Sequence, residues 1–254
     1  MKFIALFTLL FSFTTNLYSQ NNTGEIIYEE ILNLHRSLPP EMEAMKDRMP
    51  EYRKSKKILY FNESEALYIN KPKSEKELKA QQEFRGEGRR GPGRRFGRNN
   101  NNKFYTNFKA EESIDSRNFF GKDFLITGKR SPLKWKITGD QKQVGAYLCQ
   151  KATYQDSTQN IVAWFTPMIP VSSGPDDYFG LPGLILHMDF DQGLRQITAT
   201  DIVLDVLADD VIVRPTEGKK VTQEEFEKIR EEKIKEREEE FGGSVRGRRF
   251  RGGR

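Results

Sequence analysis

The stretch Gly180-Leu181-Pro182-Gly183-Leu184-Ile185 is an apolar corner around which we expect this chain to fold. Glycine adopts backbone conformations that are closed to other residues, and proline fixes φ and removes a hydrogen-bond donor. A surface turn would carry Asn, Asp or Ser instead, so this corner is expected beside a core. The strand-like run Leu184–Phe190 leaves it. We therefore predict that Leu181 and Leu184 are buried.

The segment before this corner is unusually rich in residues that constrain the backbone. Residues 167–183 contain four prolines and three glycines, between the strand-like runs Ile161–Thr166 and Leu184–Phe190. This composition predicts a rigid, irregular crossing rather than a tight hairpin. We call residues 167–183 the crossing segment. Its last residue, Gly183, is expected at positive φ, and the hexapeptide is interpreted as primarily architectural.

Short runs of β-branched and aromatic residues recur between turn signals along most of the chain. The strands expected on this pattern cover residues 24–32, 57–62, 66–70, 104–108, 113–119, 122–128, 133–138, 144–154, 161–166, 184–190 and 196–206. A turn is expected at Gly139-Asp140. The spacing predicts a mainly β fold: an antiparallel sheet curled as an open or half barrel. One short N-terminal helix is expected to pack on it, and a C-terminal helix is expected to be solvated.

Residues 1–19 are typical of a secretory signal peptide. Lys2 precedes the apolar run Phe3–Phe13, and the small residue Ser19 marks the expected cut. The alternative, a membrane anchor, is disfavoured because the apolar run is shorter than the ~20 residues that a span requires. The chain is therefore expected to be exported, to the periplasm, the outer membrane or the medium. No later segment is apolar enough for a transmembrane span.

The charge pattern divides the remaining sequence. The 254-residue chain has a formal net charge of +5 and concentrates arginine and glycine in two places. We predict a β domain over residues 20–213 with a disordered insert at about 72–103, a charged helix over 214–241 and a disordered tail over 242–254. A capping box of Thr222 and Glu225 supports the helix.

The arginines of the insert and tail are candidate contacts for anions. They are Arg89, Arg90, Arg94, Arg95, Arg248, Arg249 and Arg251. Arginine-glycine runs bind RNA elsewhere, but export argues against a nucleic-acid partner here. An anionic surface polymer fits the same charge physics. The alternative, a solubilising loop without a partner, stays open.

One candidate metal site lies in the region of the N-terminal helix. Met42, Met45 and Met49 recur at helical spacing, and His35 is nearby in sequence. Thioether sulfur suits copper(I), so these residues are candidate ligands. Packing of an adaptable methionine face on the sheet is the simpler interpretation.

Candidate catalytic residues are few. Cys149 and His187 come from distant strands and are a conceivable thiol nucleophile and base. Cys149 sits in the middle of a strand, with no helix N-terminus to lower its pKa, so a buried inert thiol is favoured. Asp176 and Asp177 suit either a cation or a solvated turn. The sequence does not support an enzyme, and it indicates no cofactor.

Several motifs together resemble one family. They are Trp135-Lys136-Ile137, residues 144–153, Ala163–Thr166, Gly174-Pro175 and Phe179–Leu186. This pattern is similar to the GLPGLI family, which is named for the hexapeptide that this sequence carries intact. The likeness covers roughly residues 24–205 and is strongest over 135–186. The arginine-glycine insert and the charged C-terminal helix lie outside it.

The resemblance implies an exported Bacteroidota protein, often encoded near outer-membrane receptor genes, with no settled biochemical activity. It supplies no catalytic residues. The main hypothesis is therefore a non-enzymatic envelope module that binds an apolar ligand or a partner protein, such as an outer-membrane receptor. Copper handling by the methionines and an uncharacterised hydrolase activity are the alternatives.

Overall fold

The computed structural model describes residues 22–83, 102–129 and 131–249. The strands are β1 (Gly24–Asn33), β2 (Tyr52–Phe61), β3 (Glu65–Asn70), β4 (Lys103–Asn107), β5 (Glu112–Phe119), β6 (Lys122–Lys129), β7 (Lys136–Val144), β8 (Tyr147–Gln155), β9 (Asn160–Thr166), β10 (Leu184–Phe190), β11 (Arg195–Val203) and β12 (Lys219–Val221). The helices are the 3₁₀ helix η1 (Pro40–Arg48), α1 (Glu75–Glu83) and α2 (Gln223–Arg249). The fold is mainly β, as predicted.

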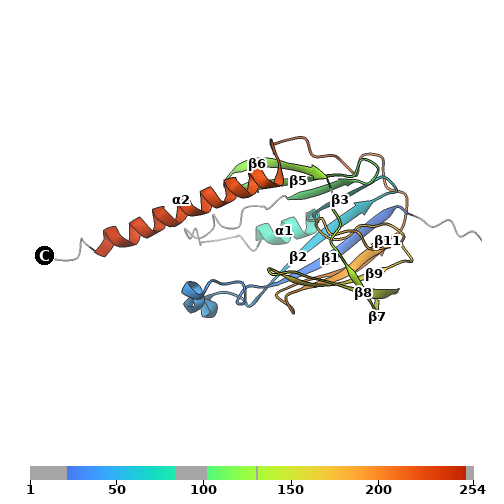
Figure 1. Ribbon diagram of the computed structural model, residues 1–254, viewed down its shortest axis with the longest axis horizontal. Helices are drawn as coiled ribbons and strands as arrows, with labels where there is room; N and C mark the ends of the chain where they lie inside the picture. Colours follow the sequence, from blue (N-terminus) through green and yellow to red (C-terminus); the bar gives the residue numbers. More distant parts are fainter. Residues whose placement is uncertain (1–21, 84–101, 130, 250–254) are drawn as a thin grey trace, which may run out of the picture.

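All twelve strands belong to one mixed sheet that is not closed into a barrel, in the order β12-β6-β5-β4-β3-β2-β1-β11-β10-β9-β8-β7. Short β12 runs parallel to β6, and the other described pairs are antiparallel. The first strand, β1, lies inside the sheet and joins β2 to β11. Figure 1 shows β5 and β6 at one end of the sheet, beside α2, and β7 and β8 at the other.

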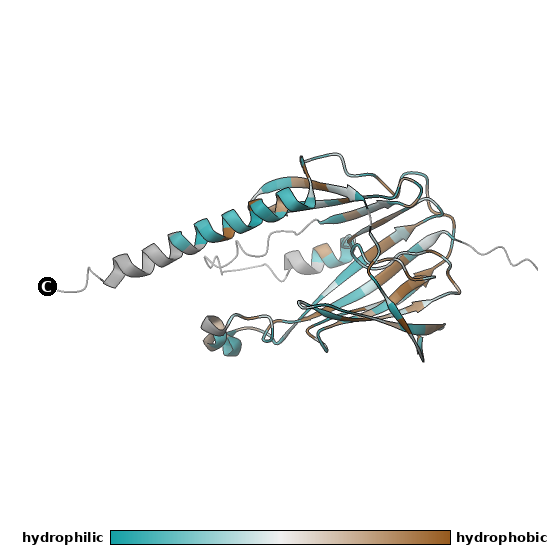
Figure 2. Cartoon of the chain, viewed as in Figure 1, coloured by the Kyte–Doolittle hydropathy of each residue, from teal (hydrophilic) through white to brown (hydrophobic). Residues whose placement is uncertain are grey.

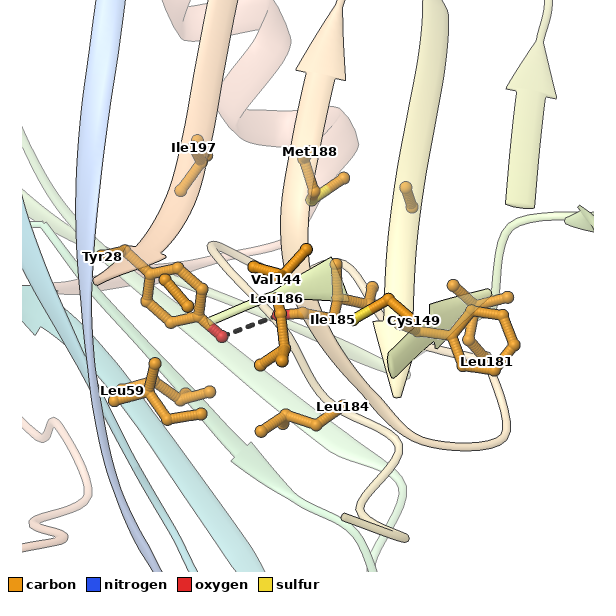
Figure 3. Close-up of a cluster of buried hydrophobic side chains, with 14 of the residues drawn as sticks. Tyr28, Leu59, Val144, Cys149, Leu181, Leu184, Ile185, Leu186, Met188 and Ile197 are labelled. Carbon is orange, nitrogen blue, oxygen red and sulfur yellow. Dashed lines mark hydrogen bonds between the residues drawn. The ribbon is translucent and has the colours of Figure 1, made fainter. Parts of the chain in front are cut away.

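The main core lies on one face of the sheet, which we call the inner face. Strand residues such as Tyr28, Phe61 and Met188 are fully buried there, together with Ile169 and Leu181 of the crossing segment. The Tyr28 hydroxyl donates a 2.7 Å hydrogen bond to the carbonyl oxygen of Ile185 (Figure 3). Because Ile169 and Leu181 are buried in this cluster, the crossing segment is part of the core. Full burial of one such large apolar side chain contributes about 1.5–3 kcal/mol to the stability of the fold.

The corner at the end of the crossing segment is built as predicted. Leu181 is 2% exposed and Leu184 is fully buried. Gly183 has a φ of 150°, and a Cβ atom there would lie 2.2 Å from the carbonyl oxygen of Thr166. The amide of Leu184 donates to the carbonyl oxygen of Ile169 at 3.1 Å, which ties the corner back onto its own segment. Only glycine fits this close approach of two backbone segments.

Strands β3 to β6 are covered on both faces. On the outer face, Leu67, Tyr105 and Leu125 form a small buried cluster with Ile212, from the β11–β12 connection. On the inner face at the β6 end, Phe226 of α2 is 2% exposed and packs against Phe124. The β11–β12 connection thus covers the outer face of these strands, and α2 covers the β6 end of their inner face.

Helix α2 begins with the predicted capping box. The amide of Thr222 donates to Glu225 at 2.8 Å, and the amide of Glu225 donates to the Thr222 hydroxyl at 3.2 Å. Figure 2 shows that the described turns beyond Phe226 are largely hydrophilic, and Ile234 is 40% exposed. Within the described ranges, no helix is both long and apolar enough to span a membrane.

The boundaries of the C-terminal helix differ from the prediction. It begins at Gln223 rather than at residue 214, because the short strand β12 comes first. It also continues through Gly242-Gly243 to Arg249. Glycine inside a helix costs about 1 kcal/mol and ends the helix only when it takes the left-handed conformation. Helix α2 thus extends into the expected tail as far as Arg249.

Two other predicted segments are corrected. Within the expected insert at 72–103, residues 75–83 form α1, because Ser74 and Glu77 cap each other: the Ser74 amide donates to Glu77 Oε2 at 2.8 Å, and the Glu77 amide donates to the Ser74 hydroxyl at 3.3 Å. The expected turn at Gly139-Asp140 lies inside β7, whose pairing is irregular between Ile137 and Gln141. An edge strand accommodates glycine at such an irregularity, and the actual turn has Gly145 at a φ of 58°.

The predicted packing of the N-terminal helix on the sheet is wrong. Met42 and Met45 of η1 are 43% and 44% exposed. The helix has 3₁₀ geometry and begins directly after Pro39, which is extended. With three residues per turn, side chains at i and i+3 eclipse, so the two methionines share one face that points away from the core.

Candidate functional site

A cavity of about 360 Å³ lies on the inner face, over strands β4, β5 and β6. Its floor includes Phe104, Asp115 and Ile126, while Tyr178 and Phe179 come from the crossing segment. Leu133 and Gln223, from the β6–β7 connection and the first turn of α2, complete the enclosure. We call it the β4–β6 cavity. Two connections of the chain and the start of α2 thus meet over three adjacent strands.

The register of the strands places the floor residues side by side. Phe104 of β4 lies opposite Asp115 of β5, which lies opposite Ile126 of β6. Directly opposed residues point to the same face, and so does Arg117, two positions after Asp115. An acidic and a positively charged side chain, Asp115 and Arg117, therefore lie among apolar neighbours on the inner face.

Asp115 and Arg117 form an ion pair through Oδ2 and a terminal guanidinium nitrogen. The other carboxylate oxygen, Asp115 Oδ1, and the other donor, Arg117 Nε, are buried without a hydrogen-bond partner. Burial raises the pKa of Asp115 from 3.8 to about 6, against the opposing effect of Arg117, and Asp177 and Asp176 raise it further. The pair is thus only half satisfied, and its acid sits in a negative surrounding.

The guanidinium of Arg117 also links the cavity to α2. It lies 5.6 Å from the ring centre of Phe104 and 5.8 Å from that of Phe226. Such cation–π contacts contribute about 0.5–2 kcal/mol, depending on solvation. The position of Arg117 is therefore set by its acid partner and by two aromatic rings.

A second polar cluster lies on the inner face farther along the sheet. Arg195 of β11 donates to Glu30 at 2.7 Å and to Asp176 of the crossing segment at 2.6 Å. Burial would raise the pKa of Glu30, but Arg195 outweighs it and the pKa is lowered. Burial would likewise lower the pKa of Arg195, but the two carboxylates raise it. This closed network fastens the crossing segment to the centre of the sheet.

Tyr68 lies between the two polar clusters. Its ring packs 6.0 Å from that of Tyr28 and 6.4 Å from that of Phe104, measured between ring centres. The side chain is 1% exposed, and its hydroxyl has no hydrogen-bond partner. Burial raises its pKa well above the usual value. The Tyr68 hydroxyl is therefore another buried polar atom without a hydrogen-bond partner, whereas the Arg195 network is paired.

The residues predicted as chemical groups do not assemble into a catalytic site. Burial raises the pKa of the Cys149 thiol to about 11, and the thiol contacts the carbonyl oxygen of Tyr147. Burial lowers the pKa of His187 to about 4, and its Nδ1 lies 2.7 Å from the Thr198 hydroxyl. Neither an activated thiol nor a base directed toward it is found at these positions.

The remaining predicted site residues are scattered. His35 Nε2 lies 3.1 Å from the carbonyl oxygen of Met49, and Asp176 is paired with Arg195. Among the described residues, no three His, Cys, Asp or Glu side chains form a group that could hold a metal. The signal peptide and Arg89, Arg90, Arg94, Arg95 and Arg251 lie outside the described residues, as do the side chains of Arg248 and Arg249.

The cavity residues were missed by sequence reasoning. In β5, Ser113, Asp115 and Arg117 alternate with Ile114 and Ser116, which is typical of a strand with a solvated polar face. The available signal was two opposite charges two positions apart beside aromatic strands. The sequence does not show that the crossing segment covers this polar face.

Comparison with known proteins finds a family that matches part of the chain and solved structures with a similar fold. A Bacteroidota-associated family described as "Protein of unknown function (Porph_ging)" matches residues 155–187, a range that includes the crossing segment and the hexapeptide. No curated protein matches the chain.

Among solved structures, PNGF-II in two crystal forms, P21 and C2, is similar to this chain. The TM-scores are 0.52 and 0.51, with 14% sequence identity in both cases. The similarity covers 82% and 81% of this chain but only 33% and 32% of the PNGF-II chain. This chain thus corresponds to about a third of PNGF-II, and the likeness concerns the fold.

Proposed function

We propose that this chain is an exported, non-enzymatic envelope protein of the GLPGLI type whose ligand site is the β4–β6 cavity. The ligand is an apolar molecule, or an apolar group of a partner protein such as an outer-membrane receptor. The site of action is the periplasm or the outer membrane. The match of residues 155–187 to a Bacteroidota-associated family supports the assignment of type.

The observation that carries this proposal is the β4–β6 cavity itself, whose lining combines apolar and aromatic side chains with the Asp115–Arg117 ion pair. Apolar walls with a few convergent polar groups are typical of ligand pockets, and a volume of about 360 Å³ is within their range.

The proposal includes a sheet that curls around this site as an open half barrel. Four strands separate β5 from β11, so the two would lie about 24 Å apart in a flat sheet. Yet Asp176 bonds to Arg195 of β11, and the next residue, Asp177, lines the cavity with Asp115 of β5. Neighbouring residues are only about 3.8 Å apart. Curling of the sheet brings both strands within reach of one short segment.

Binding without catalysis is favoured over the hydrolase hypothesis. A thiol whose pKa is raised to about 11 carries almost no thiolate at neutral pH. Asp115, whose pKa is raised by burial, is held in an ion pair on the cavity floor. Both features suit a static pocket better than a nucleophile.

The test fills the cavity from a position that tolerates a side chain. A Cβ at Gly128 meets no atom within 4 Å, and this residue lines the cavity, so Gly128→Phe places a ring inside it. Gly139 of β7 is equally open and lies outside the cavity, so Gly139→Phe is the matched control. The mature protein would be isolated from its native envelope and examined by native mass spectrometry. We expect a bound species with wild type and Gly139→Phe, and none with Gly128→Phe. Equal loading of all three proteins would contradict the proposal.

A further inference from the structure

The three walls around the β4–β6 cavity are fastened in different ways. The crossing segment is bound to the sheet through Asp176, which accepts a 2.6 Å hydrogen bond from Arg195 of β11. The β6–β7 connection is bound to the crossing segment, because Trp135 Nε1 donates to the carbonyl oxygen of Phe179 at 2.8 Å. These two walls are thus held in place by side-chain hydrogen bonds.

The third wall, the first turns of α2, is attached mainly by packing. Gln223 lines the cavity, and Phe226, nearly one turn later, is 2% exposed. The ring centre of Phe226 lies 5.6 Å from that of Phe119 and 5.5 Å from that of Phe124. Gln223 itself bonds within the helix, to Glu227 at 3.1 Å. The attachment of this wall therefore centres on one buried aromatic side chain.

The residue before α2 provides a pivot. Val221, the last residue of β12, is 5% exposed and pairs with Ile126 of β6, so it is fixed to the sheet. Only Thr222 separates it from α2. The capping box of Thr222 and Glu225 is local to the helix, so it does not depend on the burial of Phe226. Helix α2 can therefore turn about Thr222 without unfolding its first turn.

The anchor of α2 and the cavity share two residues of the sheet. Ile126 lines the cavity and also belongs to the buried cluster that contains Phe226. Arg117 lines the cavity too, and its guanidinium lies 5.6 Å from the ring centre of Phe104 and 5.8 Å from that of Phe226. A molecule in the cavity thus contacts side chains that also surround the helix anchor.

We infer that α2 is a movable wall of the β4–β6 cavity. In its docked state, which is the one described above, Phe226 is buried; in its released state, α2 turns away from β6. Release removes Gln223 from the lining, so a ligand that contacts this wall binds the docked state more tightly. Ligand binding and docking of α2 then favour each other by the same factor. This inference rests on the proposed function and adds the regulation of the same site.

The experiment measures the position of α2 with and without an apolar probe. Spin labels are attached at Glu232→Cys in α2 and Gln141→Cys in β7, two exposed positions at opposite ends of the sheet (Figure 1). Cys149 is buried and stays unlabelled. Pulsed electron paramagnetic resonance gives the distance distribution between the labels. We expect a docked and a released population, and a shift toward the docked one when the neutral dye N-phenyl-1-naphthylamine is added.

Variants assign the shift to the anchor and to the cavity. Phe226→Ala should release α2 and weaken dye binding about 10-fold, because the docked state becomes a minor population. Ile234→Ala, at a 40% exposed position farther along α2, is the matched control and should change neither quantity. Gly128→Phe should abolish dye binding by filling the cavity. The measurement on the wild type decides even where Phe226→Ala fails to fold.

The inference is overturned by equal label distances with and without the dye, or by a Phe226→Ala variant that releases α2 without weakening dye binding. Absence of dye binding that Gly128→Phe removes would overturn it as well. The proposed function is judged separately, by capture from the envelope. It survives these outcomes if Gly128→Phe abolishes the captured species and Gly139→Phe does not, and it fails if both variants capture it equally.

Discussion

The inner face of the sheet has two regions that differ in how tightly the crossing segment packs on the strands. Over β8 to β11, the crossing segment presses Ile169, Val171 and Leu181 onto the strands, and these side chains are 6% exposed or less. Over β4 to β6, the same segment contributes Asp177, Tyr178 and Phe179, and a cavity remains. The crossing segment thus packs tightly over β8 to β11, whereas over β4 to β6 it covers the strands and leaves a cavity.

The two regions also differ in how fully their buried charged groups are hydrogen-bonded. In the closed region the Arg195 network satisfies its buried charges, as buried charges require. In the cavity region, Asp115 and Arg117 keep one unpaired atom each. The first arrangement contributes stability, and the second gives up stability because two buried polar atoms stay unpaired.

The largest effect is expected where the two backbones meet in the closed region. Gly183→Val would place a Cβ atom 2.2 Å from the carbonyl oxygen of Thr166, which is far inside contact distance. We expect a loss of more than ~4 kcal/mol in the free energy of unfolding, or no folded protein. Gly139→Val, at an open position, should cost far less. Thermal unfolding by circular dichroism measures both, and an unchanged melting temperature for Gly183→Val would refute the strain.

Truncation of apolar side chains compares the two regions directly. Leu181→Ala removes a side chain that is 2% exposed and should cost about 3 kcal/mol through the cavity that it leaves. Leu133→Ala acts where space already exists and the residue is partly exposed, so about 1 kcal/mol or less is expected. Urea unfolding gives both values. Equal losses would mean that the β4–β6 region is packed as tightly as the other.

The unsatisfied acid should make stability depend on pH in an unusual direction. Burial raises the pKa of Asp115 to about 6, so between about pH 4 and 6 the folded chain holds a proton that the unfolded chain has released. The free energy of unfolding therefore falls as pH rises through this window, by roughly 2–3 kcal/mol in total.

The comparison with Asp115→Asn isolates this contribution. The lowered pKa of Glu30 acts in the opposite direction, since its stabilisation is lost as pH falls. We therefore expect the difference between wild type and Asp115→Asn in urea unfolding to shrink or change sign between pH 4 and 7. A difference that stays constant over this range would contradict the raised pKa.

The smallest effect on stability is expected at η1, outside both regions. Met42 and Met45 are 43% and 44% exposed, so replacing Met42, Met45 and Met49 by Leu should change the free energy of unfolding by less than ~0.5 kcal/mol. The same triple variant tests the copper hypothesis. Copper(I) titration should separate it from wild type if the methionines and His35 hold the ion, and identical curves would exclude the site.

The closed region could be predicted from the sequence because its signals are local. Prolines, glycines and the flanking strands indicated the crossing, and the apolar corner predicted the burial of Leu181 and Leu184. Periodicity also located most strands. It failed at β7, where Gly139 is part of an irregular edge strand rather than of a turn.

The cavity could not be predicted because it depends on which connections cover which face. Asp115 and Arg117 have the alternation of a solvated strand face, and their burial comes from residues more than sixty positions away, such as Tyr178. Periodicity reports that a face is polar, but it carries no information on what lies over that face. The η1 methionines show the converse, a helical apolar spacing that the fold leaves in solvent.

The place of β1 has a consequence for how the chain acquires its structure. Strands β2 to β6 and β7 to β11 each pair largely with their sequence neighbours, and within the described sheet the two groups are joined by strand pairing only through β1 and β11. Glu25 pairs with Val203, so the seam joins residues close to opposite ends of the domain. Pairings of such large sequence separation form slowly, because a long loop must close first. Strand β1 is therefore synthesised first but cannot pair with β11 until almost the whole sheet has been synthesised. Until then, the edge of β1 that pairs with β11 is exposed and can pair incorrectly with other strands.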